Sequence, residues 1–415
     1  MNTRQTFLSQ TQSGPYAPLR RPAMRVGISG SGFIARSIAR LISGLPDFNV
    51  VSVLTRRDTA LSEDHFPDGT VTNSVDALVA ASDIVLECSG DAVHATEVLV
   101  RAGEAGRKLI TMNCEAQVTV GTALLRRGYS ITEAHGDQPG CFAELAQEAR
   151  AMLFDPLVYV NLKGFLNLTP EPDEMAYWAN KQGVSIRQTT AFTDGSKLQL
   201  EQVLTANGLG AGIARQGLVG GTIKDLADLD YLAEAAFESG GAISDYAVYP
   251  GGPPGVAILA TSEQADSYPG FMAIAKLKTR EGRAYCLLKP YHLVHLEVAK
   301  TLRQVTRDEP PLLTNGLSPT VTSAAIVKRP LPAGTLISEG MGGFDVRGEA
   351  IEIAGNADIV PITLLDGART RHALEPGAIV RDGDVDVPDT TAAALYRESL
   401  LPISGKASVA VDAAH

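Results

Sequence analysis

The chain has 415 residues, which is too long for one ordinary hydrophobic core and predicts two or three domains. Hydrophobic residues make up 45% of the sequence, yet no run approaches the roughly 18 apolar residues that a membrane-spanning helix requires. The net charge of −11, with no Lys/Arg cluster to offset it, argues against nucleic-acid binding.

The N-terminus and the cysteines indicate where the protein works. Residues 1–22 contain no continuous apolar stretch of the signal-peptide type and are expected to form a flexible polar tail. The four cysteines lie far apart without a C-x-x-C pair, so we expect neither a disulfide framework nor a zinc site. A reducing cytoplasm is the expected location.

Residues 24–57 predict a strand, a glycine-rich turn, an amphipathic helix and a second strand, in that order. Glycines at such a turn let the backbone bend sharply and let a diphosphate approach, while the helix N-terminus offers free N–H groups to the anion. An ordinary glycine-rich turn in another α/β domain is the competing interpretation. The predicted cofactor contacts are Gly27, Gly30, Ser31, Gly32, Phe33 and Ile34.

Arg56 and Arg57 follow the second strand, where an NAD enzyme usually carries Asp or Glu for the ribose 2′-hydroxyl. Guanidinium groups attract a 2′-phosphate, and no carboxylate stands there to repel it. The pair therefore predicts NADP(H) in preference to NAD(H). The competing interpretation is two solvated arginines without a role.

The alternation of strands and helices continues to about residue 135. Strands are expected at 83–87, 108–113 and 130–134, with a helix at 94–105. This order implies a Rossmann-type parallel sheet, in which ligands bind beyond the carboxyl ends of the strands. Residues at those ends are candidates for the cofactor (Ser89, Gly90 and Asn113) and for the substrate (Glu115 and Asp137), although each is also compatible with an ordinary loop residue.

The pattern changes from residue 136, where an α+β domain is expected. Its predicted elements are a helix opening near Pro139, strands at 157–162, 184–192, 271–278 and 284–288, a helix at 196–206, a long loop at 240–256, and a helix at 293–304 that packs back on the nucleotide domain.

A linker at 308–319 precedes a third unit. Within it, residues 331–337 and 374–380 echo each other as strand, Pro/Gly turn and short strand, which is typical of a small all-β domain. A helix and tail are expected after about residue 390. The predicted domains are thus 1–22 (tail), 23–135 (nucleotide-binding), 136–312 (catalytic), 313–390 (all-β) and 391–415 (tail).

Lys197 is the first candidate for chemistry, because a carbonyl undergoing hydride transfer needs a proton donor or an electrophile at its oxygen. It opens a predicted helix, where the helix dipole and the loss of water are expected to lower its pKa. Asp194 could cap that helix or orient a substrate hydroxyl, Glu201 could pair with Lys197, and Lys163 could point into the same cleft. The competing interpretation is a capped helix with a surface Lys–Glu pair.

Asp137 and Glu144 could bind substrate hydroxyls or a divalent metal, or could simply be acids of a first helical turn. His292 is a further substrate-binding candidate; with His295 it lacks the spacing of a zinc motif. Cys114 is expected to be an inert buried thiol. The sequence leaves a divalent metal open without supporting one.

Several blocks together resemble a known group: TMNCEA (111–116), HGDQPGCFAEL (135–145), FTDGSKLQLE (192–201), KPYHLVHLE (289–297) and KRPLPAGTLI…GGFDVRG. They are similar to the homoserine-dehydrogenase-like oxidoreductases with a C-terminal SAF domain, a group that includes deoxyxylulose-phosphate reductoisomerase-like enzymes. The resemblance spans about residues 24–390. It implies an NADP-dependent nucleotide domain, a middle domain for catalysis and dimerisation, a β-clip-like SAF domain and a homodimer.

Two positions depart from this group. Homoserine dehydrogenases carry T-A-N-K where this chain ends in Cys114, so one family lysine is missing and homoserine oxidation is disfavoured, while their second lysine matches Lys197. Reductoisomerase-like members carry K-G-K-N where this chain has Phe165 in place of the second lysine. The resemblance therefore argues against a phosphorylated substrate.

The expected function is an NADP(H)-dependent oxidoreductase acting by hydride transfer on a small polar carbonyl or alcohol of sugar-like or hydroxy-acid type. One alternative is a metal-assisted reductoisomerase of a deoxyxylulose-5-phosphate-like substrate. Another is a non-catalytic, nucleotide-gated carbohydrate-binding protein. The expected partner is a small molecule, with neither nucleic acid nor membrane.

Overall fold

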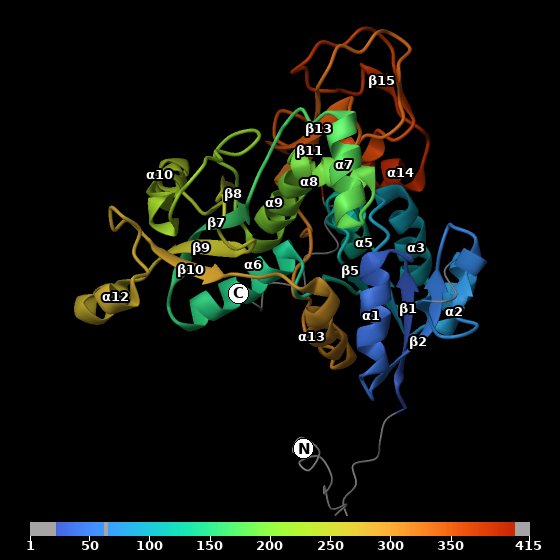
Figure 1. Cartoon of the computed structure of the whole chain (residues 1–415), viewed down its shortest axis with the longest axis horizontal. Coiled ribbons are helices and arrows are strands. Elements are labelled where there is room, and N and C mark those ends of the chain that lie inside the picture. The colour runs from blue at the N-terminus through green and yellow to red at the C-terminus, as the bar shows by residue number, and fades with distance from the viewer. Residues whose placement is uncertain (1–21, 62–64, 403–415) are drawn as a thin grey trace, which may run out of the picture.

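The computed structural model describes residues 22–61 and 65–402. The tails predicted for residues 1–22 and 391–415 lie outside this part, except for residue 22 and residues 391–402. Figure 1 shows the nucleotide domain at one side, the middle domain at the other, and the C-terminal domain above the junction between them.

The nucleotide domain is a six-stranded parallel sheet in the order β3-β2-β1-β4-β5-β6. This is the strand order of a dinucleotide-binding Rossmann sheet, so the predicted fold class is confirmed. The strands are β1 (Met24–Ser29), β2 (Phe48–Leu54), β3 (Val71–Thr72), β4 (Ile84–Glu87), β5 (Lys108–Thr111) and β6 (Ile131–Glu133). The helical segments are α1 (Phe33–Ser43), η1 (Thr59–Leu61), α2 (Val75–Ala81), α3 (Ala92–Glu104), α4 (Cys114–Ala116), the wide turn η3 (Gln117–Gly121) and α5 (Thr122–Arg126).

The middle domain is built on a mixed four-stranded sheet in the order β10-β9-β7-β8, in which β7 runs parallel to β8 and antiparallel to β9. Its strands are β7 (Asp155–Lys163), β8 (Ile243–Val248), β9 (Val256–Thr261) and β10 (Tyr285–Lys289). Its helical segments are α6 (Gln138–Ala151), α7 (Pro172–Gln182), α8 (Ile186–Thr193), α9 (Ser196–Leu209), η4 (Leu226–Leu229), α10 (Asp230–Ser239), α11 (Glu263–Asp266), α12 (Pro269–Ala275) and α13 (Val294–Thr306).

Three sequence predictions for this domain are wrong. The strand expected at 184–192 is helix α8, because Ser185 and Gln188 form a reciprocal capping box that starts a helix. The strand expected at 271–278 is mostly helix α12, which has a proline in its first turn and no buried residue. The loop expected at 240–256 contains β8, which pairs in parallel with β7 at one edge of the sheet.

The C-terminal domain consists of short antiparallel strands. They are β11 (Val321–Val327), β12 (Leu336–Ile337), β13 (Val346–Glu352), β14 (Ala368–Thr370) and β15 (Val385–Asp386), with the turn η5 (Ile362–Leu364) and the helix α14 (Thr391–Leu400). The two echoing segments pair with each other: Leu331 and Leu374 exchange backbone hydrogen bonds of 2.9 and 2.8 Å. Their similarity therefore reflects two antiparallel arms of one small unit.

The C-terminal domain is anchored on the first turns of α9. The backbone N–H of Gly348 donates to Ser196 Oγ at 2.8 Å, and that of Ala350 donates to Gln199 Oε1 at 2.8 Å. These contacts lie on both sides of Lys197 in sequence. At the other end of the middle domain, α13 returns to the nucleotide domain and packs Val298 and Leu302 into the core beneath α1.

No helix within residues 22–61 and 65–402 combines the length and the apolar character needed to cross a membrane.

Candidate active site

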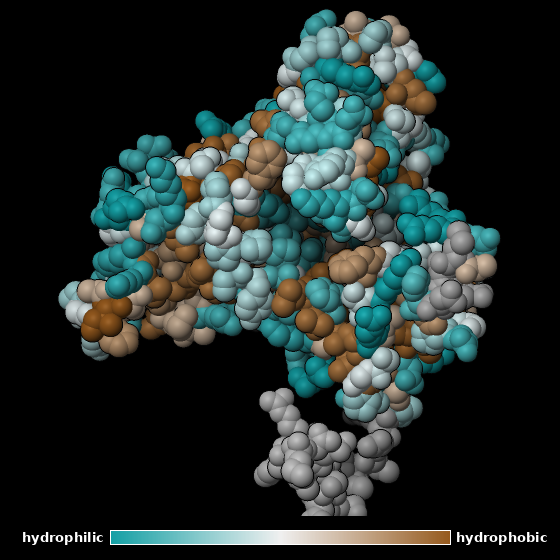
Figure 2. All heavy atoms as spheres, viewed as in Figure 1, coloured by the Kyte–Doolittle hydropathy of each residue, from teal (hydrophilic) through white to brown (hydrophobic). Residues whose placement is uncertain are grey.

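A cavity of about 900 Å³ lies where the three domains meet. The nucleotide domain contributes Ile34 and Gly90 to its lining, the middle domain contributes Lys197, and the C-terminal domain contributes Thr363 and Asp366. In the space-filling view, the surface is hollowed near the centre of the molecule, between the C-terminal domain with α7 and the nucleotide domain (Figure 2). The strand ends of the Rossmann sheet open into this region, as expected for an α/β site.

The turn between β1 and α1 has room for a diphosphate. Gly30 has a φ of +116°, and a Cβ there would lie 3.1 Å from the carbonyl oxygen of Cys88. Gly32 precedes α1 without any side-chain cap, and a Cβ on it would meet nothing within 4 Å. The free N–H groups of this helix end therefore face open space, the arrangement that binds phosphate groups at helix N-termini.

The glycine motif of the dinucleotide-binding turn begins at Gly30 and not at Gly27. Gly27 lies inside β1, where a Cβ would come within 2.1 Å of Ser82 Oγ, so this glycine makes room for a neighbouring helix and not for a cofactor. Counted from Gly30, the sequence Gly-Ser-Gly-Phe-Ile-Ala places the buried Ala35 at the position where a small residue lets helix and strand pack closely. Phe33 is 65% exposed, and Ile34 lines the cavity.

Arg56 and Arg57 follow β2, as expected. The guanidinium of Arg56 donates to Asp91 Oδ2 at 2.7 Å, across the carboxyl edge of the sheet. Asp91 also caps α3 through the N–H groups of Val93 and His94. Arg56 is therefore held above the strand ends by the loop after β4, close to where the adenosine ribose lies in Rossmann domains.

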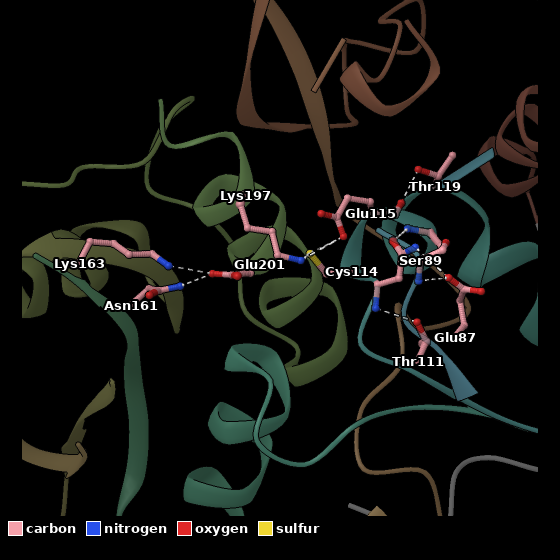
Figure 3. Close-up of polar contacts among 12 residues, drawn as sticks. Glu87, Ser89, Thr111, Cys114, Glu115, Thr119, Asn161, Lys163, Lys197 and Glu201 are labelled. Carbon is pink, nitrogen blue, oxygen red and sulfur yellow. Dashed lines mark hydrogen bonds and ion pairs between the residues drawn. The ribbon is translucent and has the colours of Figure 1, made fainter. Parts of the chain in front are cut away.

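Lys197 forms a buried ion pair at the bottom of the cavity. Its Nζ lies 3.1 Å from Glu115 Oε2 and 3.1 Å from Cys114 Sγ (Figure 3). Gly195, with a φ of +81°, turns the chain into α9 so that Lys197 points back toward α4 of the nucleotide domain. The ammonium group therefore crosses the domain boundary to the residue pair that follows β5.

The expectation that the pKa of Lys197 is lowered is wrong. Burial opposes the charged ammonium, but the pKa is raised well above its ordinary value, because negative charge from Cys114, Glu115, Asp137 and Glu201 outweighs the desolvation. Burial in turn raises the pKa of the Cys114 thiol well above its usual range, so the carboxylates carry the effect. Lys197 is therefore a fixed cation at neutral pH.

Lys163 and Glu201 form a second pair facing the first. Lys163 Nζ donates to Glu201 Oε2 at 3.3 Å, and Asn161 Nδ2 donates to the same oxygen at 2.9 Å (Figure 3). The pKa of Glu201 is lowered despite its burial, chiefly by the charges of Lys163 and Lys197. Sequence reasoning paired Glu201 with Lys197, whereas the structure pairs it with Lys163.

Asp137 and His292 also line the cavity. Burial raises the pKa of Asp137 to about 6, against the opposing charge of Lys197. The imidazole of His292 lies 3.2 Å from Gln138 Nε2, and burial lowers its pKa, so it is neutral at physiological pH.

Three predicted site residues lie elsewhere. Asp194 is 1% exposed and accepts a hydrogen bond of 2.9 Å from Lys328 Nζ of the C-terminal domain, outside the cavity lining. Asn113 caps α4 by accepting from Ala116 N–H at 3.0 Å. Glu144 on α6 forms an ion-pair cluster with Lys289.

The position of these three residues outside the cavity lining has one cause. Each was placed in the cleft from its position beside a strand end or helix start, and each side chain turns instead toward a cap or a buried ion pair. Ser89 likewise lies beside the lining, and its backbone N–H donates to Glu87 Oε1 at 2.7 Å. Gly90 does line the cavity.

Several lining residues were missed by sequence reasoning. Arg187 of α8 bonds Asp366 of the C-terminal domain at 2.7 Å, and both border the cavity. Met175 and Trp178 of α7 and Met341 supply an apolar wall. No sequence motif indicated them, because no element was predicted at 172–182 and residues 184–192 were predicted to form a strand. The S-x-x-Q capping box at 185–188 was the available signal.

Among the described residues, no group of three or more His, Cys, Asp or Glu side chains has an arrangement that could hold a metal ion. His292, a substrate-binding candidate from the sequence, contacts Gln138.

Residues 136–298 match the family model described as "Oxidoreductase DRL, catalytic domain". Among curated proteins, none matches this sequence. The fold is similar to UDP-N-acetylglucosamine 3-dehydrogenase GnnA from Acidithiobacillus ferrooxidans (15% identity, TM-score 0.41, 71% of this chain and 93% of that one). It is also similar to a probable dehydrogenase from Thermotoga maritima (12%, 0.42, 70% and 91%) and to GenD2 from gentamicin A biosynthesis, determined with NAD (11%, 0.37, 73% and 92%).

Likeness to solved structures at this level concerns the fold alone. The matched catalytic domain, joined to a Rossmann domain with an open diphosphate turn, defines the class: the protein is an enzyme, an NAD(P)-dependent oxidoreductase. Its match to the DRL catalytic domain covers the segment from the Gly136 turn to the middle of α13.

Proposed function

We propose that the protein is an NADP(H)-dependent oxidoreductase that interconverts a carbonyl and an alcohol on a small, uncharged, polyhydroxylated substrate. The observation that carries the proposal is the buried ion pair between Lys197 and Glu115. It holds an ammonium group where the nucleotide domain meets the middle domain, beside the cavity.

The proposed chemistry follows from the fixed charge of Lys197. When bound, a nicotinamide cofactor supplies or accepts the hydride. Lys197 stabilises the negative charge that develops on the substrate oxygen, and its charge is already in place because Glu115 holds it. Lys163 lies opposite and orients a second substrate oxygen. Asp194, which sequence reasoning placed beside the substrate, keeps only a structural role in the turn before Lys197.

Cofactor preference is assigned from Arg56 and Arg57. Their guanidinium groups follow β2 without a carboxylate in the same segment, which supports recognition of a 2′-phosphate. Gly30, Ser31 and Gly32 would hold the diphosphate, and Gly90 would border the ribose.

The charge of the lining argues for an uncharged substrate. Each lysine and arginine that lines the cavity is already paired: Lys163 with Glu201, Lys197 with Glu115 and Arg187 with Asp366. A phosphate group would need cations that are free to meet it. The aromatic and thioether wall from α7 suits the C–H face of a sugar-like molecule.

The test is NADPH oxidation by the purified full chain with a panel of carbonyl compounds. The panel pairs each neutral hydroxyketone or keto-sugar with its phosphate ester, with and without added Mg²⁺. We expect turnover on a neutral member and weaker turnover on its ester. Preference for the ester together with Mg²⁺-dependent turnover would favour the reductoisomerase alternative, and tight NADPH binding without any turnover would favour a binding protein.

A further inference from the structure

The carboxyl group of Glu133 has no explained role. Glu133 ends β6 and is 0% exposed, and neither of its carboxyl oxygens has a hydrogen-bond partner among the described residues. A buried carboxylate without donors is costly, because it has lost its hydration and gained nothing in return. Glu133 must therefore be protonated or share a proton with a neighbour.

The neighbour is Asp137, four residues later. The turn between them contains Gly136 at a φ of +85°, where a Cβ would come within 2.7 Å of Glu297, so only glycine fits. This turn brings the Asp137 carboxyl within reach of that of Glu133, and Oδ2 of Asp137 is likewise buried without a hydrogen-bond partner. Two carboxyl groups can bond to each other only when one of them carries a proton.

The charges around the pair give the two carboxyl groups different pKa values. Burial and the adjacent charge of Asp137 raise the pKa of Glu133 well above its ordinary value, whereas burial raises the pKa of Asp137 only to about 6, against the opposing charge of Lys197. Glu115 on α4 and Glu201 on α9 are the other charged groups facing Asp137, and both disfavour its ionisation. Both oxygens of Glu133 are buried without a partner, whereas Asp137 has one such oxygen and borders the cavity, so the shared proton is assigned to Glu133.

We propose that Glu133 is a positioning residue that holds one proton against Asp137, so that Asp137 presents a carboxylate to the cavity and serves as the acid–base group of the reaction. This inference rests on the proposed function. It divides the chemistry between Lys197, a permanent cation, and Asp137, which exchanges the proton.

The proton balance is as follows. In alcohol oxidation, the substrate C–H bond breaks with its electron pair going to the oxidised nicotinamide. The O–H bond breaks with its proton going to Asp137, and the C=O bond forms. The carboxyl pair passes from one proton to two. In carbonyl reduction, Asp137 returns that proton to the oxygen as the carbon receives the hydride.

The decisive experiment needs neither cofactor nor substrate, so its outcome is independent of whether the proposed function is correct. Glu133→Gln keeps the size of the side chain and can still donate a hydrogen bond to Asp137. In infrared difference spectra at pH 7.5, we expect wild type to show a protonated-carboxyl C=O band that Glu133→Gln lacks and that the control variant Glu201→Gln retains.

Thermal unfolding across pH gives the matching readout. A carboxyl whose pKa is raised by folding stabilises the protein below its unfolded pKa and loses that contribution as the pH rises through its folded pKa. The Tm of Glu133→Gln relative to wild type should therefore increase from pH 5 to pH 8. Glu201→Gln should show no such trend between pH 5 and pH 8, because the pKa of Glu201 is lowered and its carboxyl is ionised in both the folded and the unfolded state throughout this range.

The Asp137→Asn variant covers the case in which Glu133→Gln fails to fold. Removing the neighbouring charge should let the Glu133 band titrate at a lower pH than in wild type. An unchanged band titration in Asp137→Asn, or a Tm difference for Glu133→Gln that does not vary with pH, would overturn the proposal.

Discussion

Two buried lysines lie near the start of α9, and they differ in their relation to the cavity. Lys197 and Lys328 are both ion-paired, with side chains 13% and 4% exposed. Lys197 borders the cavity and reaches a carboxylate of the nucleotide domain, whereas Lys328 lies behind the same turn and reaches Asp194. Burial and pairing are thus shared by the lysine proposed for catalysis and by a structural lysine, and the two differ in that Lys197 borders the cavity.

Lys328, the lysine with a structural role, should have a larger effect on the free energy of unfolding than Lys197. Lys328→Met leaves the carboxyl of Asp194 buried without its cation, which typically costs about 3–5 kcal/mol of stability. Denaturant unfolding of the full chain measures this loss. The double variant Lys328→Met/Asp194→Asn should recover part of it. If Lys328→Met unfolds like wild type, the anchoring role of the pair is refuted.

Lys197, the lysine proposed for catalysis, should have a larger effect on turnover than Lys328. Lys197→Met removes a fixed charge at the substrate oxygen and should lower kcat roughly 100- to 1,000-fold, with NADPH affinity nearly unchanged. Steady-state kinetics on the best substrate of the panel and calorimetry with NADPH separate the two quantities. Near-normal turnover would remove Lys197 from the mechanism.

The site itself shows which of its parts a sequence can predict. Helix and strand periodicity and the glycine turn predicted the Rossmann order, and strand-end positions pointed to Glu115 and Asp137, because these follow from local chain geometry. Side-chain direction does not follow in the same way. Asp194 and Asn113 stood at equally suggestive positions, and both turn into caps or ion pairs set by tertiary contacts.

The remaining misses have the same origin. Phe192 belongs to a segment rich in β-branched and aromatic residues, which favoured a strand, but the capping box at Ser185 and packing against α7 make it helical. The contribution of Thr363 and Asp366 depends on how a third domain docks on α9, and no local pattern encodes that docking.

The arginines after β2 are proposed to bind the cofactor, in contrast to Lys197 and Lys328, which are held in buried ion pairs. Arg56 is 60% exposed in its side chain and is held only by Asp91. The variant Arg56→Ser/Arg57→Ser should weaken NADPH binding about 10- to 100-fold and NADH binding much less, because charge-assisted bonds to the 2′-phosphate are lost. Calorimetric titration with both cofactors tests this. Equal losses for the two would refute the 2′-phosphate assignment.

The central claim is that the diphosphate of NADP(H) lies against the main chain at Gly32. Gly32 has ordinary extended backbone angles and open space around it, so Gly32→Ala should fold normally, as should the control Gly270→Ala at the similarly open start of α12. We predict that calorimetry finds NADPH bound by wild type and by Gly270→Ala but strongly weakened in Gly32→Ala. Unchanged NADPH affinity in a well-folded Gly32→Ala variant would contradict the account.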